Sequence, residues 1–365
     1  MAIYRNTAGG EYVEQGAWSA EPGARGTEEG VNDVDTLPQA SGPLPPASSP
    51  LANEVQVGLQ QTPKRLSSRF FYDAEGSRIF AEIMRSPDYY LTRSEYEILD
   101  TYKADLLRYV TTNNRPFDLV ELGAGDGLKT KILLGYFADQ HADFTYAPVD
   151  ISAAALEELV VGIHQKWPDL RLNPRHEDYF RALEHLSEET TDQPASPRRV
   201  VLFLGSNIGN FTPEETLDFY RQLYDRLQPG DVVLTGFDLQ KHPAIIHTAY
   251  NDRQGLTRAF NLNLLRRINR ELDANFDLAA FDHYELYNPE TGEARSYLVS
   301  QKAQLVRIDA LDMDVPFQYG EIIHTEISRK FTRFQIEELA QATGFSVAGW
   351  FTDCKGYFAD VLFER

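Results

Sequence analysis

The residues of this chain that most clearly could do chemistry form a glycine-rich turn between a buried strand and a helix. The segment DLVELGAGDGLKT, residues 118–130, supplies apolar strand residues and then three alternating glycines, Gly123, Gly125 and Gly127. Glycines let backbone amides approach a ligand closely. The flanking carboxylates of Glu121 and Asp126 oppose a pyrophosphate and suit a cationic nucleoside better. S-adenosylmethionine is the common nucleoside cofactor with a positive charge, and a purely structural turn is the alternative.

Two acidic residues follow later strands at positions suited to a nucleoside. Asp150 ends the strand predicted at 144–152, where its carboxylate can accept both ribose hydroxyls. The alternative is an N-cap of the next helix, a role that Ser152 can take instead. Asp178 can accept from an adenine amine while the ring of Tyr179 packs against the base, and a solvated loop acid is the alternative.

The segment GSNIGNFTP, residues 205–213, follows the most hydrophobic strand of the sequence. Gly205 and Gly209 allow the backbone to turn sharply beside a ligand. The amide of Asn210 offers both a donor and an acceptor, which suits an amino-acid headgroup. A turn asparagine in the left-handed conformation is the alternative.

The elements that must position these groups alternate along the chain. Hydrophobic periodicity predicts strands at 118–122, 144–152, 170–173, 198–206 and 231–239, and helices at 129–137, 153–166 and 214–227. This alternation predicts a doubly wound α/β fold, in which a parallel sheet is joined by right-handed crossovers. Ligands of such folds bind beyond the carboxyl ends of the strands.

The C-terminal segment predicts how the sheet is completed. Thr332 and Gln335 have the spacing of a capping box before a helix that ends at Thr343. Strands at 347–352 and 357–363 then flank a short Asp-Cys-Lys-Gly turn. NAD-binding Rossmann domains usually end in parallel strands, whereas class I S-adenosylmethionine-dependent methyltransferases close their sheet with an antiparallel hairpin. The hairpin therefore favours a methyl donor over a nicotinamide.

A second lobe is expected where the alternation stops, near Lys241. A helical region at 244–270 precedes strand-like segments at 294–305 and 322–329. Before the glycine turn, the sequence predicts a helix at 77–84 and another from Thr92, with Glu95 at capping-box spacing. The sequence therefore predicts three regions. Residues 1–53 form an acidic, Pro-rich disordered tail. Residues 54–93 and 240–330 form an inserted α+β substrate-binding lobe, and residues 94–239 and 331–365 form a domain that binds S-adenosylmethionine.

Composition narrows the classes of partner. The net charge of −20 argues against binding to nucleic acid or to an anionic membrane. A single cysteine, Cys354, excludes an intramolecular disulfide and a Cys-based zinc cluster, and we expect no metal. The sequence has neither a secretory signal nor an apolar run long enough to span a bilayer. We therefore expect a cytoplasmic monomer that acts on a small molecule.

Six motifs resemble, in order and spacing, the histidine-specific Nα-methyltransferase family of ergothioneine biosynthesis. They are FFYDAEGSRIF, SPDYYLTRSEYEIL, VELGAGDGLKT, FLGSNIGNFTP, AYNDRQGLTRAFNLNLLRRINREL and HTEISRKF, and they cover roughly residues 60–365. That family trimethylates the α-amine of L-histidine with S-adenosylmethionine to give hercynine. The resemblance implies that the substrates are L-histidine and its mono- and dimethylated forms.

The resemblance also implies roles for individual residues. The implied cofactor contacts are Tyr89, Gly123, Lys129, Asp150, Asp178 and Tyr179. The implied substrate contacts are Tyr72, Phe80, Tyr89, Gly205, Asn210, Tyr250, Glu326 and Ser328. Tyr72 and Asn210 are the candidates for orienting the amine during methyl transfer.

Glu326 and Ser328 are the residues that would select the imidazole ring. They lie two apart in a strand-like segment, so both side chains point to one face. A carboxylate and a hydroxyl can together satisfy both imidazole nitrogens. Ser296 departs from the family pattern, because a methionine stands beside the ring in a relative. The alternatives are an Nα-methyltransferase of another amino acid, such as tryptophan or tyrosine, and a catalytically silent S-adenosylmethionine-binding or scaffold protein.

Overall fold

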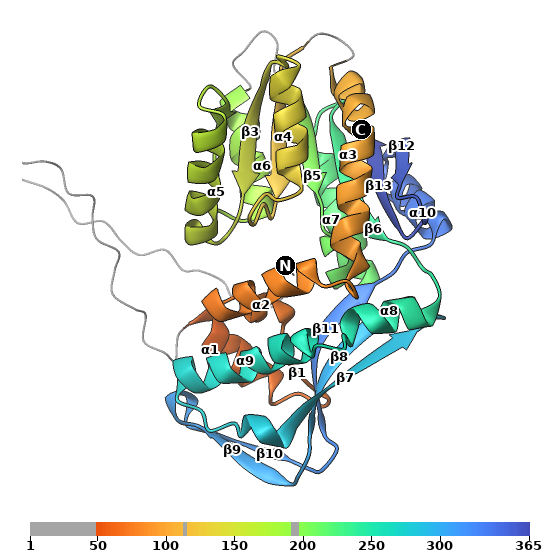
Figure 1. Ribbon diagram of the computed structural model, residues 1–365. Coiled ribbons are helices and arrows are strands. Elements are labelled where there is room, and N and C mark those ends of the chain that lie inside the picture. The colour runs from red at the N-terminus through yellow and green to blue at the C-terminus, as the bar shows by residue number, and fades with distance from the viewer. Residues whose placement is uncertain (1–48, 112–114, 191–196) are drawn as a thin grey trace, which may run out of the picture.

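The protein folds into two lobes that are stacked end to end (Figure 1). The computed structural model describes residues 49–111, 115–190 and 197–365. We call residues 90–239 with 331–365 the core domain, and residues 50–89 with 240–330 the second lobe.

The core domain is built on one seven-stranded sheet. Its strands, in spatial order, are β12 (Ser346–Thr352), β13 (Phe358–Glu364), β6 (Val232–Asp238), β5 (Arg198–Phe203), β2 (Phe117–Leu122), β3 (Phe144–Val149) and β4 (Arg171–Leu172). β13 alone runs in the opposite direction to the other strands of this sheet. This confirms both the doubly wound sheet and the antiparallel C-terminal hairpin. The strand order reverses between β2 and β5, which is where such folds bind ligands.

Helices cover both faces of this sheet. They are α3 (Tyr90–Val110), α4 (Thr130–Asp139), α5 (Ala153–Lys166), α6 (Tyr179–Thr190), α7 (Pro213–Arg226) and α10 (Arg333–Thr343). One apolar cluster packs α6, α7 and α10 against the sheet, and another packs α3, α4 and α5 against it. Because both faces are covered, the central strands are almost wholly buried. The capping box of Thr332 and Gln335 is confirmed at the start of α10.

The second lobe surrounds a smaller sheet. Its elements are α1 (Pro50–Gly58), β1 (Lys64–Arg65), η2 (Ser68–Phe71), α2 (Ala74–Arg85), α8 (Pro243–Tyr250), α9 (Leu256–Leu272), η4 (Leu278–Ala280), β7 (Phe281–Asn288), β8 (Glu293–Ser300), β9 (Gln304–Ile308), η5 (Asp309–Leu311), β10 (Met313–Phe317) and β11 (Ile322–Arg329). The sheet order is β1-β11-β8-β7, and β9 pairs with β10. Residues from both parts of the chain share one apolar cluster, in which α1 and α2 meet α9 and the sheet. The N-terminal helices and the insertion therefore form one body (Figure 1).

Four predictions about elements need correction. The tail does not extend to residue 53, because α1 begins at Pro50 with Leu51 and Ala52 buried. Residues 1–48 of the predicted tail lie outside the described residues. The predicted boundary at 93/94 falls inside α3, which is one continuous helix. The predicted strand at 294–305 is the end of β8, a turn and the start of β9, and the prediction missed β7 altogether.

The fourth correction concerns the start of α3. The helix begins at Tyr90, and Tyr89 precedes it without a side-chain cap. Thr92 and Glu95 therefore lie inside the helix, and the predicted capping box is wrong. Glu95 is 1 % exposed, because its carboxylate points into the core domain.

Candidate functional site

The glycine turn after β2 has the backbone that its sequence demands. Gly123, Gly125 and Gly127 have φ values of 76°, 53° and 61°, which side chains rarely allow. A Cβ on Gly123 would lie 2.8 Å from the Tyr179 hydroxyl oxygen. The turn therefore needs glycine both for its conformation and for the close approach of Tyr179.

Asp150 links this turn to the next strand end. Its Oδ2 accepts from the Gly125 backbone N–H at 3.1 Å, and its Oδ1 accepts from the Ser152 backbone N–H at 2.9 Å. Ser152, not Asp150, is the N-cap of α5. The N-cap alternative for Asp150 is therefore wrong, and its carboxylate holds two ligand-side loops together.

Asp178 and Tyr179 begin α6. The Asp178 carboxylate accepts from the backbone N–H groups of Phe180 and Arg181, both at 3.1 Å, so it caps the helix instead of remaining a solvated loop acid. Tyr179 is buried, and its ring packs edge-on against Phe203 in the core domain. The hydroxyl end of Tyr179 faces the glycine turn.

A buried carboxylate that sequence reasoning missed organises the other side of the turn. Glu95 accepts from the Gly205 backbone N–H at 2.7 and 3.0 Å, and it also accepts from the Lys129 ammonium. A Cβ on Gly236 of β6 would lie 2.2 Å from Glu95 Oε1, so the missing side chain makes room for this carboxylate. Gly205 has a φ of 79°, which confirms the sharp turn predicted there. Glu95 thus joins Lys129 and Gly205, two residues predicted to bind different ligands.

Aromatic side chains of the second lobe form a contiguous cluster, which we call the aromatic wall. The Tyr72 ring lies 5.4 Å from both Phe80 and Phe260, and Tyr89 lies 6.4 Å from Phe80 and 6.2 Å from Tyr250. All these pairs meet edge to face. These electron-rich faces suit a quaternary ammonium group.

A cavity of about 440 Å³ lies between the two lobes. It is lined by residues of both, namely Ser49, Pro50, Leu51, Arg69, Phe70, Tyr72, Ile151, Ser152, Asp178, Tyr179, Arg267 and Glu271. Tyr72 is 48 % exposed. The pKa of Tyr72 is nevertheless raised, first because the protein displaces water around it and then by the charge of Glu326. The cavity therefore joins the cofactor side to the aromatic wall.

Glu326 and Ser328 lie on β11 at the inner wall of the second lobe. A β-bulge shifts the pairing with β8 between His324 and Glu326, so Thr325 is the extra residue. Glu326 then lies opposite Ser296 of β8. Burial raises the pKa of the Glu326 carboxyl to about 7, although the nearby Lys330 ammonium opposes that rise. No hydrogen bond to the Glu326 carboxylate comes from the described part of the chain, so its oxygens are available to a ligand.

A second buried acid, Glu285 of β7, lies on the far side of Ser296 from Glu326 in the same sheet. Ser296 donates to Glu285 Oε2 of β7 at 2.9 Å. Burial raises the pKa of the Glu285 carboxyl to about 9, and the charge of Glu326 adds to the rise. The sequence analysis did not predict Glu285, although apolar and polar residues alternate in the segment around it.

Asn210 lies on η3 (Asn207–Asn210), which packs against β11. A Cβ on Gly209 would lie 2.9 Å from the Arg329 carbonyl oxygen, so this contact requires glycine. Left-handed backbone occurs at Gly205 and Ser206, not at Asn210. The alternative of a left-handed turn asparagine at Asn210 is therefore wrong.

The strand order, the antiparallel β13 and the glycine turn at the switch point together define a class I S-adenosylmethionine-dependent methyltransferase. The family model of histidine-specific, S-adenosylmethionine-dependent methyltransferases matches residues 51–365. The chain belongs to this family.

Relatives support the same family. A histidine N-alpha-methyltransferase of Mycolicibacterium smegmatis is 39 % identical over 86 % of this chain and 95 % of its own length. The enzyme of the same name from Mycobacterium tuberculosis is 38 % identical over 84 % of this chain and 92 % of its own length. Ergothioneine biosynthesis protein 1 of Schizosaccharomyces pombe is 29 % identical over 79 % of this chain, which corresponds to 38 % of that longer protein.

None of the helices in the described part of the chain combines the length and the apolar composition that a membrane span requires. In the same part of the chain, no group of three His, Cys, Asp or Glu residues is placed to hold a metal ion.

Proposed function

We propose that this protein transfers three methyl groups in succession from S-adenosylmethionine to the α-amine of L-histidine. The product is hercynine, and the reaction is the first step of ergothioneine biosynthesis. The observation that supports the substrate most strongly is the inner wall of β11. Burial raises the pKa of Tyr72 and Tyr89, and the Glu326 carboxylate lies close enough to add to that rise. The Ser328 hydroxyl contacts the Tyr250 hydroxyl. A neutral imidazole ring has one donor and one acceptor nitrogen, which Glu326 and Ser328 can match.

The glycine turn fits the cofactor by its own geometry. Three left-handed glycines leave the backbone open beside Tyr179, and Asp150 lies at the next strand end. In our proposal, Gly123, Lys129, Asp150, Asp178, Tyr179 and Tyr89 hold the cofactor. When bound, S-adenosylmethionine supplies a methyl group on a positively charged sulfur.

The remaining work of the enzyme is alignment. The accepting nitrogen must lose its proton before it can attack, and no strong base is needed once the amine lies in a pocket that disfavours its charge. Tyr72 and Asn210 would orient the nitrogen lone pair, which lowers the barrier by fixing the approach. The aromatic faces of Tyr72, Phe80 and Tyr89 would favour the quaternary product by cation–π attraction.

The direct test is Glu326→Ala in purified protein, assayed with S-adenosylmethionine and L-histidine. Histidine turnover should fall by at least about tenfold, the loss expected when a buried ligand group loses a charged partner. Calorimetry should find cofactor affinity unchanged. Glu337→Ala on the exposed face of α10 is the matched control and should alter neither quantity.

Two results would redirect the proposal. Equal losses of turnover and cofactor affinity in Glu326→Ala would count against ring recognition by Glu326. Binding of the cofactor without turnover of any amino acid would favour a silent binding protein. The monomeric state and the cytoplasmic location stay predictions, and light scattering of the purified protein tests the first.

A further inference from the structure

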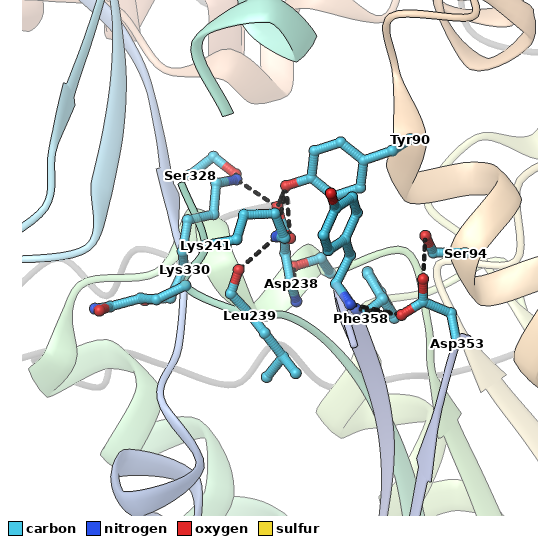
Figure 2. Close-up of polar contacts among 12 residues, drawn as sticks. Tyr90, Ser94, Asp238, Leu239, Lys241, Ser328, Lys330, Asp353 and Phe358 are labelled. Atoms are coloured by element: carbon cyan, nitrogen blue, oxygen red, sulfur yellow. Dashed lines mark hydrogen bonds and ion pairs between the residues drawn. The ribbon is translucent and has the colours of Figure 1, made fainter. Parts of the chain in front are cut away.

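Lys330 is a fully buried lysine at the junction of the two lobes. It follows β11, and the next residue, Phe331, forms a bridge with Leu239 after β6. Lys330 is 1 % exposed, and it faces Asp238 at the end of β6. Figure 2 shows Lys330, Lys241 and Tyr90 converging on that carboxylate.

All three N–H groups of the Lys330 ammonium are occupied. Its Nζ lies 2.6 Å from the Tyr250 hydroxyl, 2.8 Å from the Ser328 hydroxyl and 2.9 Å from Asp238 Oδ2. An ammonium group has three donors and no acceptor. Lys330 therefore donates to both hydroxyls and cannot itself contact a ligand.

This contact restricts what the two hydroxyls can offer. The Tyr250 and Ser328 oxygens lie 2.8 Å apart, so one of them donates to the other. Each hydroxyl has one donor and two acceptor sites, and one acceptor site on each is filled by Lys330. The oxygen that receives the shared proton keeps its own hydrogen for the pocket, and the other oxygen keeps one lone pair. The two hydroxyls therefore offer a ligand one donor and one acceptor, and the donor and the acceptor belong to different residues.

We propose that Lys330 is a positioning residue that couples recognition of the substrate carboxylate to recognition of its ring. This inference rests on the proposed function. The family resemblance implies that Tyr250 helps to hold the carboxylate and amine of the substrate. When Tyr250 donates its hydrogen to that carboxylate, Ser328 donates to Tyr250 and is left as an acceptor for one ring N–H. The other ring nitrogen then meets Glu326, either as an acceptor from the protonated carboxyl or as the second N–H of a charged ring. Without Lys330, each hydroxyl has one more lone pair free, so the hydroxyl that accepts the shared proton can also accept from a ligand, and the two contacts no longer depend on each other.

Lys241 provides a matched control within the same cluster. It also pairs with Asp238, and it contacts Tyr90 and the Leu239 carbonyl. In the described part of the chain, no contact joins Lys241 to Tyr250 or Ser328. Burial would raise the pKa of the Asp238 carboxyl, but the two ammonium groups outweigh it and hold that pKa below its usual value. Removal of either lysine leaves Asp238 with the other.

The test compares Lys330→Met with Lys241→Met. For each variant, steady-state assays give kcat and KM for L-histidine, and calorimetry gives the dissociation constant for S-adenosylmethionine. Lys330→Met should raise the histidine KM by roughly tenfold or more, the factor expected for a hydrogen bond to a charged group, while cofactor affinity stays within about twofold. Lys241→Met should keep the histidine KM within about twofold of wild type. If Lys330→Met does not fold, Lys330→Gln replaces it and should raise KM in the same direction.

A second readout tests the coupling itself. Histidinol lacks the carboxylate, and its inhibition constant can be compared with the histidine KM in each protein. Wild type should discriminate between the two ligands more strongly than Lys330→Met does, whereas Lys241→Met should discriminate like wild type. If the two lysine variants raise KM equally while wild type methylates histidine, this inference is overturned and the proposed function stands. If wild type does not methylate histidine, the proposed function is overturned, and this inference falls with it.

Discussion

Replacing Glu326 by glutamine should stabilise the protein at alkaline pH while weakening its recognition of histidine. Burial raises the pKa of Glu326 from 4.5 to about 7. The folded protein therefore keeps this proton up to about pH 7, whereas the unfolded chain releases it near pH 4.5. Stability is lost as pH rises through this window and is constant above it. Glutamine removes that loss because it does not ionise.

The size of the effect follows from the pKa values. One pKa unit corresponds to about 1.4 kcal/mol, so ionisation of Glu326 lowers the free energy of unfolding by at most about 2.5 kcal/mol between pH 5 and pH 8. Water in the pocket reduces this figure, because the side chain is only partly buried in the free protein. The amide of glutamine contributes an offset that does not depend on pH. The gain of Glu326→Gln over wild type should therefore grow between pH 5 and pH 7 and then level off.

Urea unfolding of wild type and Glu326→Gln from pH 5 to pH 9 measures this gain. Glu285→Gln is the informative companion, because the pKa of Glu285 rises to about 9 and its gain should continue to grow up to that pH. Glu337→Gln, on the exposed face of α10, should shift the free energy of unfolding by less than about 0.5 kcal/mol throughout. A gain for Glu326→Gln that is the same at pH 5 and pH 8, or that becomes smaller as pH rises, would show that burial does not raise the pKa of Glu326.

Further predictions concern residues that support the proposed ligand-binding residues without contacting a ligand themselves. Gly236→Ala should weaken S-adenosylmethionine binding by roughly tenfold in calorimetry, because its Cβ would lie 2.2 Å from Glu95 Oε1 and would displace the carboxylate that holds Lys129, a proposed cofactor contact. Gly162→Ala, where the added Cβ meets nothing within 4 Å, should instead stabilise the protein by about 0.5–1 kcal/mol with unchanged cofactor affinity. Ser296→Ala should lower the free energy of unfolding by about 1–2 kcal/mol, because Glu285 loses its donor, and an unchanged urea midpoint would refute that contact.

The core domain was predictable because its signals are local. The strands of the parallel sheet are buried on both faces, so they appear as continuous apolar runs, such as the one from Val200 to Leu204. The turn after β2 is recognisable from its glycines, because glycine adopts the positive φ values of this turn without strain. The capping box at Thr332 depends on residues three apart, and the structure confirms it. Local chemistry thus predicts the sheet, its hairpin and the cofactor side of the site.

The rest depends on contacts between residues far apart in sequence. Glu95 has the spacing of a capping box with Thr92, but it is drawn into the core domain by Lys129 and the Gly205 amide. The bulge at Thr325 that sets the pairing of Glu326 depends on β8, which lies about 30 residues earlier. Lys330 was not predicted because lysine is rarely buried in proteins, so the sequence alone gives no reason to expect this one inside. The one available signal was Asp238, a carboxylate at the carboxyl end of a fully buried strand.

The second lobe should select histidine as the methyl acceptor. The most direct measurement incubates the purified protein with S-adenosylmethionine and an equimolar mixture of the twenty amino acids, followed by mass spectrometry. Histidine alone should be consumed, with products that carry one, two and finally three added methyl groups on the α-amine. Preferential methylation of tryptophan, tyrosine or any other amino acid, or unmodified histidine in the presence of bound cofactor, would contradict this prediction.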